Sequence, residues 1–283
     1  MKIGITGATG QLGRKVVENL KGKTSAEQIA ALVRSPDKAS DMGVEVRNFD
    51  YSKPETLEKG LEGIDRLLLI SSSEIGKRVQ HHTNVIEAAK KAGVKWIVYT
   101  SLLHADTSSL NLAPEHLESE AVIKESGIDY TILRNGWYTE NYTSSIPSAV
   151  ENGAFIGSAG DGKISSATRE DFAEAAVAVI LDESNKGEVY ELAGDTSYTL
   201  TDLAAEISKQ TGKDIPYKNL PEDEYVKILK SAGLPELFAE AIASWDTSAS
   251  KGDLFDEGHQ LSNLIGRSTT PLSKAVKDAL DNK

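Results

Sequence analysis

Three glycines near the start of the chain are spaced as in a turn that binds phosphate groups. Gly7, Gly10 and Gly13 follow the apolar segment 3–5 and precede a helical pattern over residues 11–20. A strand, a glycine-rich turn and a helix in this order aim free backbone N–H groups and the positive end of the helix dipole at a dinucleotide pyrophosphate. A tight turn without a ligand explains one such glycine better than three. The pattern therefore favours a dinucleotide site.

One arginine after the second expected strand could decide which dinucleotide binds. Arg34 directly follows the apolar segment 30–33. In chains that prefer NAD this place usually holds a carboxylate, whereas an arginine can pair with the 2′-phosphate of NADP, and Ser35 and Lys38 could add donors. The alternative is a solvated arginine at the start of a helix. Beside the glycine turn, Arg34 favours the phosphorylated cofactor.

Polar side chains follow two further expected strands. Ser71, Ser72 and Ser73 come directly after the apolar run 67–70. Because the carboxyl ends of parallel strands face the ligand, these hydroxyls are expected at the nicotinamide half of the cofactor. A helix N-cap explains any single serine equally well. Asp50 is either a contact for the adenine end or a turn residue.

Large aromatic rings, amides and a carboxylate follow another expected strand, over residues 135–142. Flat rings such as Trp137 and Tyr138 stack on flat ligands, and amides bind carbonyl groups, so this mixture suits the mouth of a ligand pocket. An aromatic core cluster is the alternative. Segment 160–163 is expected to form a hairpin turn, from which Lys163 could reach a ligand.

The histidines do not have the spacing of metal ligands. His81, His82, His104 and His116 include no pair four residues apart that is accompanied by a carboxylate, so no metal site is expected. Isolated histidines are more often surface or core residues than catalytic ones. His116, near the start of an expected helix, is the one candidate for a contact with the substrate.

A pair of residues common in carbonyl reduction is missing. None of the nine tyrosines is followed by a lysine four residues later, although such a lysine would lower the pKa of a tyrosine that donates a proton. The chain also has no cysteine, so electrons must come from a bound cofactor. A suitable acceptor takes up hydride readily and obtains its protons from solvent, as a quinone does because its reduced form is aromatic.

The charge and hydropathy of the chain argue against some classes of binding partner and indicate where the protein is located. The 31 basic and 43 acidic residues give a net charge of −12, which argues against nucleic acid or an anionic membrane as the main partner. No apolar run approaches the length that spans a bilayer, and the first strand starts too early to leave room for a signal peptide. We therefore expect a cytoplasmic protein. No heptad pattern or edge strand indicates an oligomeric state.

Alternating elements must position these residues. Strand-like runs at 3–6, 29–33, 44–49, 67–70, 96–100 and 130–133 alternate with helical patterns at 11–20, 54–61, 79–92 and 114–126. This alternation predicts an α/β fold with a Rossmann-like, doubly wound parallel sheet. We expect residues 1–133 to form the NAD(P)-binding domain and residues 134–283 a smaller α/β lobe that caps the substrate, parts of which could return to the main sheet. Within that lobe, helices are expected at 169–181, 200–210, 222–231 and 235–244, and a strand at 189–192.

Several segments together carry a resemblance to a known family. They are residues 7–13, 33–34, 69–74, 99–106, 130–142, 155–168 and 250–256. In these segments, which span nearly the whole chain, the sequence resembles the NmrA-like group of atypical short-chain dehydrogenases, and within it the NADPH-dependent quinone oxidoreductases of type 2.

The resemblance implies an enzyme that transfers hydride from NADPH to a small quinone held between the sheet and the smaller lobe. Substrate contacts are expected from Trp137, Tyr138 and His116. The expected cofactor contacts are Gly7, Ala8, Thr9, Gly10, Gln11, Leu12, Arg34, Ser71, Ser72, Ser73, Asn135, Gly136, Trp137, Tyr138, Thr139 and Glu140. A non-catalytic NADP(H)-binding redox sensor of the NmrA type and a reductase of triphenylmethane dyes are the alternatives.

Overall fold

The strands predicted for the first half of the chain form one parallel sheet, joined by a seventh strand from the second half. The computed structural model describes residues 1–281. The strands are β1 (Ile3–Thr6), β2 (Ile29–Val33), β3 (Glu45–Asn48), β4 (Arg66–Leu69), β5 (Trp96–Leu102), β6 (Asp129–Asn135) and β8 (Val189–Leu192). Their order is β3-β2-β1-β4-β5-β6-β8, and all neighbours are parallel. The chain reverses its direction across the sheet between β1 and β4, which is where doubly wound folds bind ligands.

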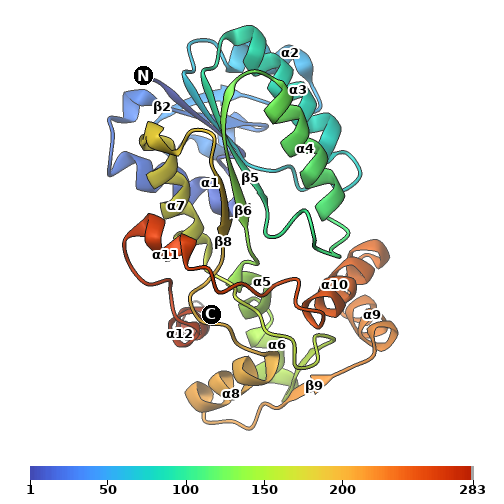
Figure 1. Ribbon diagram of the computed structural model, residues 1–283. Helices are drawn as coiled ribbons and strands as arrows, with labels where there is room; N and C mark the ends of the chain where they lie inside the picture. Colours follow the sequence, from blue (N-terminus) through green and yellow to red (C-terminus); the bar gives the residue numbers. More distant parts are fainter. Residues whose placement is uncertain (282–283) are drawn as a thin grey trace.

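Helices cover both faces of this sheet (Figure 1). One face carries α1 (Gln11–Lys21) and α7 (Arg169–Leu181), and the other carries α2 (Pro54–Gly60), α3 (Arg78–Ala92) and α4 (Ala113–Glu125). Side chains alternate between the faces along each strand. Ala31 and Val33 of β2 therefore join the core beneath α1, whereas Leu32 packs with α2 and α3.

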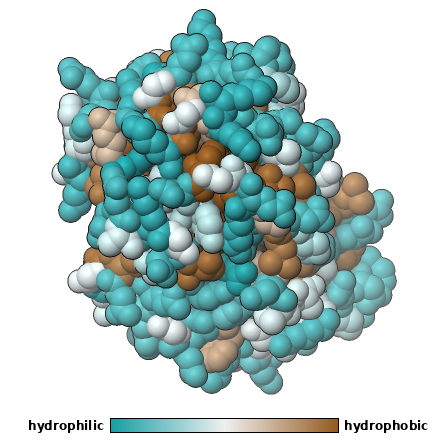
Figure 2. Space-filling view, turned by 45° about the horizontal axis from the view of Figure 1, so that its top comes forward, coloured by the Kyte–Doolittle hydropathy of each residue, from teal (hydrophilic) through white to brown (hydrophobic). Residues whose placement is uncertain are grey.

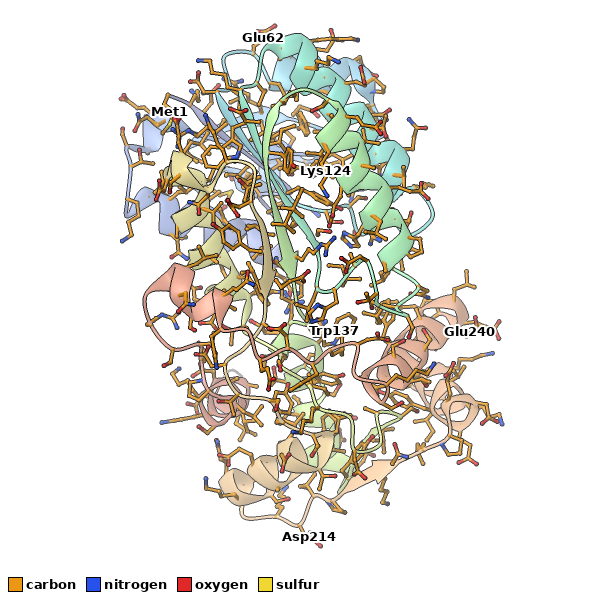
Figure 3. All side chains as sticks on the ribbon, in the orientation of Figure 1. Met1, Glu62, Lys124, Trp137, Asp214 and Glu240 are labelled. Carbon is orange, nitrogen blue, oxygen red and sulfur yellow. The ribbon has the colours of Figure 1, made fainter. Side chains whose placement is uncertain are left out.

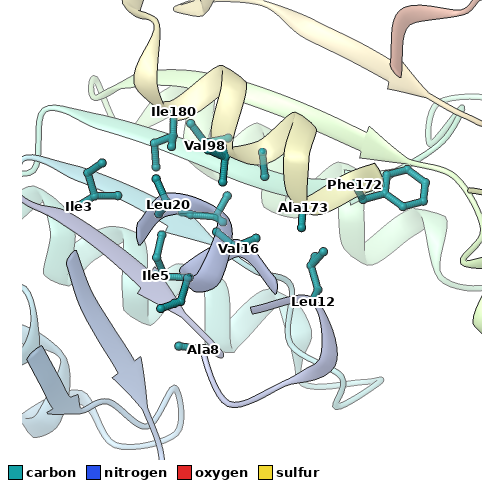
Figure 4. Close-up of a cluster of buried hydrophobic side chains, with 14 of the residues drawn as sticks. Ile3, Ile5, Ala8, Leu12, Val16, Leu20, Val98, Phe172, Ala173 and Ile180 are labelled. Atoms are coloured by element: carbon teal, nitrogen blue, oxygen red, sulfur yellow. The ribbon is translucent and has the colours of Figure 1, made fainter. Parts of the chain in front are cut away.

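The core beneath α1 and α7 fixes the position of the glycine turn (Figure 4). Ile3 and Ile5 of β1 are fully buried there with Val16 and Leu20 of α1. The two helices run in the same direction, since Leu12 lies near Phe172 at one end of the cluster and Leu20 near Ile180 at the other (Figure 4). Both helices therefore begin at the carboxyl edge of the sheet.

The smaller lobe lies below the carboxyl ends of the strands (Figure 1). Its two strands, β7 and β9, pair in parallel, and a separate hydrophobic cluster forms its core. Its elements are α5 (Thr139–Thr143), α6 (Ile146–Asn152), β7 (Phe155–Gly157), α8 (Leu200–Thr211), β9 (Tyr217–Asn219), α9 (Glu222–Ser231), α10 (Glu236–Ala249) and α12 (Leu272–Asp281).

The second half of the chain contributes to both layers. Helix α7 packs on α1, β8 pairs with β6, and α11 (Gln260–Ile265) packs against α7 and β8. These three elements belong to the sheet layer, and the remainder of segment 134–281 forms the smaller lobe. The chain therefore crosses between the layers several times, which a single boundary after residue 133 does not describe.

One turn differs from its prediction. Segment 160–163 does not join two antiparallel neighbours, because β7 before it pairs in parallel with β9, and Ile164 after it bridges to Tyr198. The hairpin predicted there was wrong, since a hairpin requires adjacent antiparallel strands. The ammonium of Lys163 lies 5.6 Å from the centre of the Phe255 ring.

Most of the visible surface is polar. The face shown in Figure 2 is mostly hydrophilic, and apolar side chains reach it in small separate groups. Within residues 1–281, no helix combines the length and hydropathy needed to cross a bilayer.

Candidate functional site

The glycine turn has the backbone geometry of a phosphate cradle. Gly7 has a φ of +58°, and the Gly10 N–H donates a hydrogen bond to the Gly7 carbonyl at 2.8 Å. A Cβ on Gly13 would lie 2.4 Å from the Gly7 oxygen, so only glycine fits there. Helix α1 starts without a side-chain cap or an acidic residue in its first turn. Its first N–H groups and its dipole therefore favour an anionic ligand.

A small polar cavity of about 350 Å³ opens on one side of this turn. It brings together many residues that the sequence singled out: Gly7, Thr9, Gly10, Arg34, Ser35, Lys38, Asp50, Ser71, Ser72 and Ser73. The side chain of Arg34 is 71% exposed, and its Nη1 lies 3.5 Å from Oε1 of Glu74. An exposed pair of this length contributes little stability, so the guanidinium can turn to an anionic ligand.

Hydrogen bonds fix the floor of the small cavity. The backbone N–H of Ser72 donates to Nε2 of His82 at 2.9 Å, and Oγ of Ser72 lies 2.9 Å from Nδ1 of His81. Because Nε2 of His82 accepts, its proton sits on Nδ1, which lies 2.8 Å from Oγ of Ser119. Burial lowers the pKa of His82 to about 3, so this ring is neutral and holds the serine loop in place.

Asp50 is a turn residue as well as part of the cavity wall. Its Oδ1 accepts hydrogen bonds from the backbone N–H of Ser52 at 3.1 Å and from the Ser52 hydroxyl at 2.8 Å. The same carboxylate lines the small cavity. The turn role is therefore observed, and the contact with the adenine end stays a prediction.

A much larger cavity of about 1150 Å³ opens on the other side of the glycine turn. Gln11 lines it, whereas Gly10, its neighbour in the chain, lines the small cavity. Both cavities therefore reach the first residues of α1. A dinucleotide whose diphosphate rests on this turn would have one end in each cavity.

Aromatic side chains from distant segments form a wall of the large cavity. Trp137 lies where the sheet layer meets the smaller lobe (Figure 3). Its ring meets that of Trp245 edge to face at 5.4 Å, and Phe238 packs edge to face on Trp245 at 6.3 Å. The indole N–H of Trp245 donates to Oδ1 of Asn111 at 2.9 Å, which fixes that ring. Rigid rings of this kind suit a flat, apolar ligand.

The other residues of the stretch 135–140 lie partly in the wall of the large cavity and partly in packing contacts away from it. Glu140 lines the large cavity and accepts a hydrogen bond from the backbone N–H of Arg169 at 2.9 Å. The Tyr138 ring instead packs on Phe172 at 5.4 Å and beneath the Arg169 guanidinium at 4.4 Å. A Cβ on Gly136 would lie 2.9 Å from the Leu192 oxygen, so this residue permits close contact between β6 and the segment after β8.

Two polar side chains of this stretch are buried. The Thr139 hydroxyl lies 2.8 Å from that of Ser166. Among the described residues, Oδ1 of Asn135 is buried without a hydrogen-bond partner. A buried amide oxygen of this kind costs free energy unless a ligand donates to it. Asn135 therefore fits a cofactor that carries a carboxamide.

His116 lies apart from these residues. It is buried on α4, and its Nδ1 is 2.8 Å from the Tyr99 hydroxyl. Burial lowers the pKa of His116 well below its usual value, so it is a neutral core residue. This position does not support the substrate contact expected for His116.

Several cavity residues were missed by sequence reasoning. Arg169, Trp245 and Asp246 all line the large cavity. Trp245 and Asp246 lie on α10 and reach the cavity only because the smaller lobe folds back beneath the sheet. Their local sequence is an ordinary helical pattern without a motif. A search of residues 1–281 finds no group of three or more His, Cys, Asp or Glu that could hold a metal ion.

Comparison with known proteins agrees with this geometry. The model of an NAD(P)H-binding family matches residues 7–183. Quinone oxidoreductase 2 of Escherichia coli (strain K12) is 56% identical over 277 residues, which cover 97% of this chain and 97% of that protein. The fold and the NmrA-like resemblance predicted from the sequence are confirmed.

Two solved structures are also similar. The crystal structure of an NADPH-dependent quinone oxidoreductase from E. coli in complex with NADPH has a TM-score of 0.96 and 55% identity, and covers 98% of this chain and 99% of that chain. The triphenylmethane reductase of Citrobacter sp. in complex with NADP(H) has a TM-score of 0.95 and 39% identity, with coverages of 98% and 100%. This chain therefore belongs to the NAD(P)H-binding, NmrA-like family that includes quinone oxidoreductase 2.

Proposed function

We propose that this protein is an NADPH-dependent oxidoreductase that reduces a small quinone by two electrons. The observation that carries the proposal is that two unlike cavities both reach one glycine turn, at the neighbouring residues Gly10 and Gln11. The 56% identity to quinone oxidoreductase 2 over nearly the whole chain supports the same reaction. When bound, NADPH supplies the hydride that the acceptor receives.

The chain's own residues hold the cofactor in three places. The turn from Gly7 to Leu12 holds the diphosphate, and Asn135 offers its unpartnered amide oxygen to the nicotinamide carboxamide. Arg34 exchanges its weak pair with Glu74 for the 2′-phosphate. Ser71 and Ser73 border the same cavity.

The large cavity holds the acceptor. Trp137 and Trp245 offer ring faces and edges to a flat quinone and exclude water around it. Catalysis then rests mainly on orientation, because the walls hold the acceptor against the reduced ring. We also propose a cytoplasmic location, which gives access to reduced cofactor, and no role for nucleic acid, since the net charge of −12 repels a polyanion.

A reductase of triphenylmethane dyes is the second candidate. The reductase of Citrobacter sp. is 39% identical over 98% of this chain, and an aromatic cavity accepts flat dyes as well as quinones. The higher identity to a quinone oxidoreductase favours quinones.

Steady-state oxidation of NADPH tests the proposal. Purified protein is mixed with NADPH and either 1,4-benzoquinone or a triphenylmethane dye, with heat-inactivated protein as the control. We expect kcat/KM to be higher for the quinone than for the dye and higher with NADPH than with NADH. Binding of NADPH without consumption by any of several quinones would instead identify a redox sensor.

A further inference from the structure

A carboxyl group is buried at the wall of the large cavity. Asp246 is only 5% exposed, yet it lines that cavity. Its Oδ2 accepts a hydrogen bond from the backbone N–H of Ser158 at 2.9 Å, and its Oδ1 accepts one from the Tyr142 hydroxyl at 3.2 Å. Both donors are neutral, so neither compensates a buried negative charge.

The groups around Asp246 are mainly aromatic. Tyr142 on α5, Tyr217 on β9 and Tyr225 on α9 are the titratable groups that interact with it electrostatically. Burial raises the pKa of Asp246 to about 6. The charged side chains that line the same cavity are Glu140, Arg169 and Lys218, and Arg169 pairs with Glu140 at 3.3 Å.

A merely structural link between α10, α5 and β7 would not need a carboxyl group. An asparagine would satisfy the same two partners without the cost of burying a charge, because its oxygen can accept from the Ser158 N–H while its amide nitrogen donates to the Tyr142 oxygen. What a carboxyl group adds is the ability to hold and release a proton. Reduction of a quinone uses such a proton, because the hydride brings two electrons and one hydrogen and leaves a negative charge on a quinone oxygen.

We propose that Asp246 and Tyr142 form the proton relay that protonates the reduced acceptor in the large cavity. This inference rests on the proposed quinone reduction. Tyr142 also lines the cavity, and it lies on α5, two residues after Glu140, which lines the same cavity. Tyr142 and Asp246 thus form a hydrogen-bonded pair in the wall of the cavity that is proposed to hold the acceptor.

The direction of one hydrogen bond controls the relay. While Asp246 is ionised, it accepts the hydrogen of the Tyr142 hydroxyl. Once protonated, Asp246 donates to the Tyr142 oxygen, and the Tyr142 hydrogen turns to the acceptor. The electron pair on the acceptor oxygen then bonds this proton, the Tyr142 O–H bond breaks, and the Asp246 proton replaces it. Asp246 is left as a carboxylate and takes its next proton from solvent.

The variant Asp246→Asn tests the relay, because the amide keeps the shape and an acceptor oxygen. In the wild type we expect kcat for quinone reduction to fall as the pH rises through about 6. In Asp246→Asn we expect this dependence to vanish and kcat at low pH to be at least about tenfold lower. Tyr142→Phe should lose kcat in the same way with an unchanged Kd for NADPH. Asp223→Asn, on a 74% exposed carboxylate of α9, is the matched control and should keep the wild-type profile.

A second readout needs neither cofactor nor acceptor. Trp245 is the neighbour of Asp246 in the chain and contacts Trp137, so fluorescence of the ligand-free protein should show a transition near pH 6 that Asp246→Asn lacks. The relay would be overturned if the Asp246→Asn variant kept the wild-type kcat and its pH profile. It would also be overturned if this variant kept the fluorescence transition of the wild type. Failure of the wild type to reduce any quinone would overturn the proposed function, and the fluorescence titration would still report on Asp246 separately.

Discussion

The two cavities that reach the glycine turn are built in different ways. The small cavity is formed by short loops that directly follow β1, β2, β3 and β4, and its walls are mostly backbone and small polar groups. The large cavity is formed by side chains from segments as far apart as Gln11 and Asp246. The small cavity suits one charged end of a ligand, and the large cavity offers a broad aromatic surface. Under the proposed function, selectivity for the cofactor and tolerance for the acceptor would follow from different parts of the molecule.

The largest effect is expected where the two cavities share their support. In Gly13→Ala the new Cβ would lie 2.4 Å from the Gly7 oxygen and 2.7 Å from the Ala8 Cα, so the turn must move. We expect loss of both NADPH and NADH binding and a decrease of about 2 kcal/mol in the free energy of unfolding. Calorimetry and denaturant unfolding measure the two effects.

Gly22→Ala is the control for that variant, because a Cβ there would lie 3.4 Å from its nearest neighbour, the Asn19 oxygen. This variant should bind NADPH as the wild type does. Normal cofactor binding by Gly13→Ala would show that the turn does not carry the diphosphate.

A smaller effect is expected at one end of the small cavity. Arg34→Ser removes a charge-assisted hydrogen bond to the 2′-phosphate, which is worth about 1.5–3 kcal/mol, so the Kd for NADPH should rise about 10- to 150-fold. The Kd for NADH should stay within about twofold and serves as the internal control. Equal weakening of both cofactors in a calorimetric titration would contradict the role of Arg34.

The same contrast explains what the sequence could predict. The strands of the sheet, the glycine turn and Arg34 follow from local patterns, because each loop of the small cavity directly follows a buried strand. The helix predicted at 79–92 is observed as α3, which ends before Gly93 in the left-handed conformation with a φ of +75°. Local sequence patterns therefore predict most of the residues of the small cavity.

The large cavity could not be predicted to the same extent. Asp246 and Trp245 reach it only through the fold of the smaller lobe, and β8 enters the sheet from the second half of the chain. His116 stood out as a polar residue near a helix start, but packing against Tyr99 buries it. Long-range packing decides these positions, and a single sequence carries no local signal for it.

At the aromatic wall we expect a moderate effect that spares the cofactor. Trp245→Leu removes a ring that is proposed to contact the acceptor, and an aromatic contact is worth about 0.5–1.5 kcal/mol, so the KM for the quinone should rise about 2- to 12-fold. The Kd for NADPH should not change. Leu237→Ala, on an 81% exposed side chain of the same helix, should behave as the wild type in both measurements. An unchanged KM in Trp245→Leu would place the acceptor elsewhere.

The smallest expected effect is a pair of opposite pH responses. The pKa of His82 beside the small cavity falls from 6.5 to about 3 on folding, so its contribution to stability is present above pH 6.5 and is lost as the pH falls toward 3. The pKa of Asp246 rises from 3.8 to about 6, so its contribution is present below pH 3.8 and is lost as the pH rises through 6. Between pH 3.8 and about 6, a fall in pH lowers the free energy of unfolding through His82 and raises it through Asp246.

A variant that lacks one of these two titratable side chains should show the pH response of the other alone. On going from about pH 5.5 to about 4.5, Asp246→Asn should lose about 1 kcal/mol more unfolding free energy than the wild type, and His82→Gln about 1 kcal/mol less. Denaturant unfolding at the two pH values measures both differences. Changes of the same sign in the two variants would contradict the assigned protonation states.

A single-turnover experiment tests most directly whether the two cavities act as one site. Protein in excess over NADPH, so that all cofactor is bound, is mixed rapidly with 1,4-benzoquinone while the absorbance of the reduced nicotinamide is followed. We predict that the bound NADPH is oxidised completely in one exponential phase, with one quinone reduced per cofactor, and that it persists when quinone is omitted. Bound NADPH that survives in the presence of quinone would contradict a shared site.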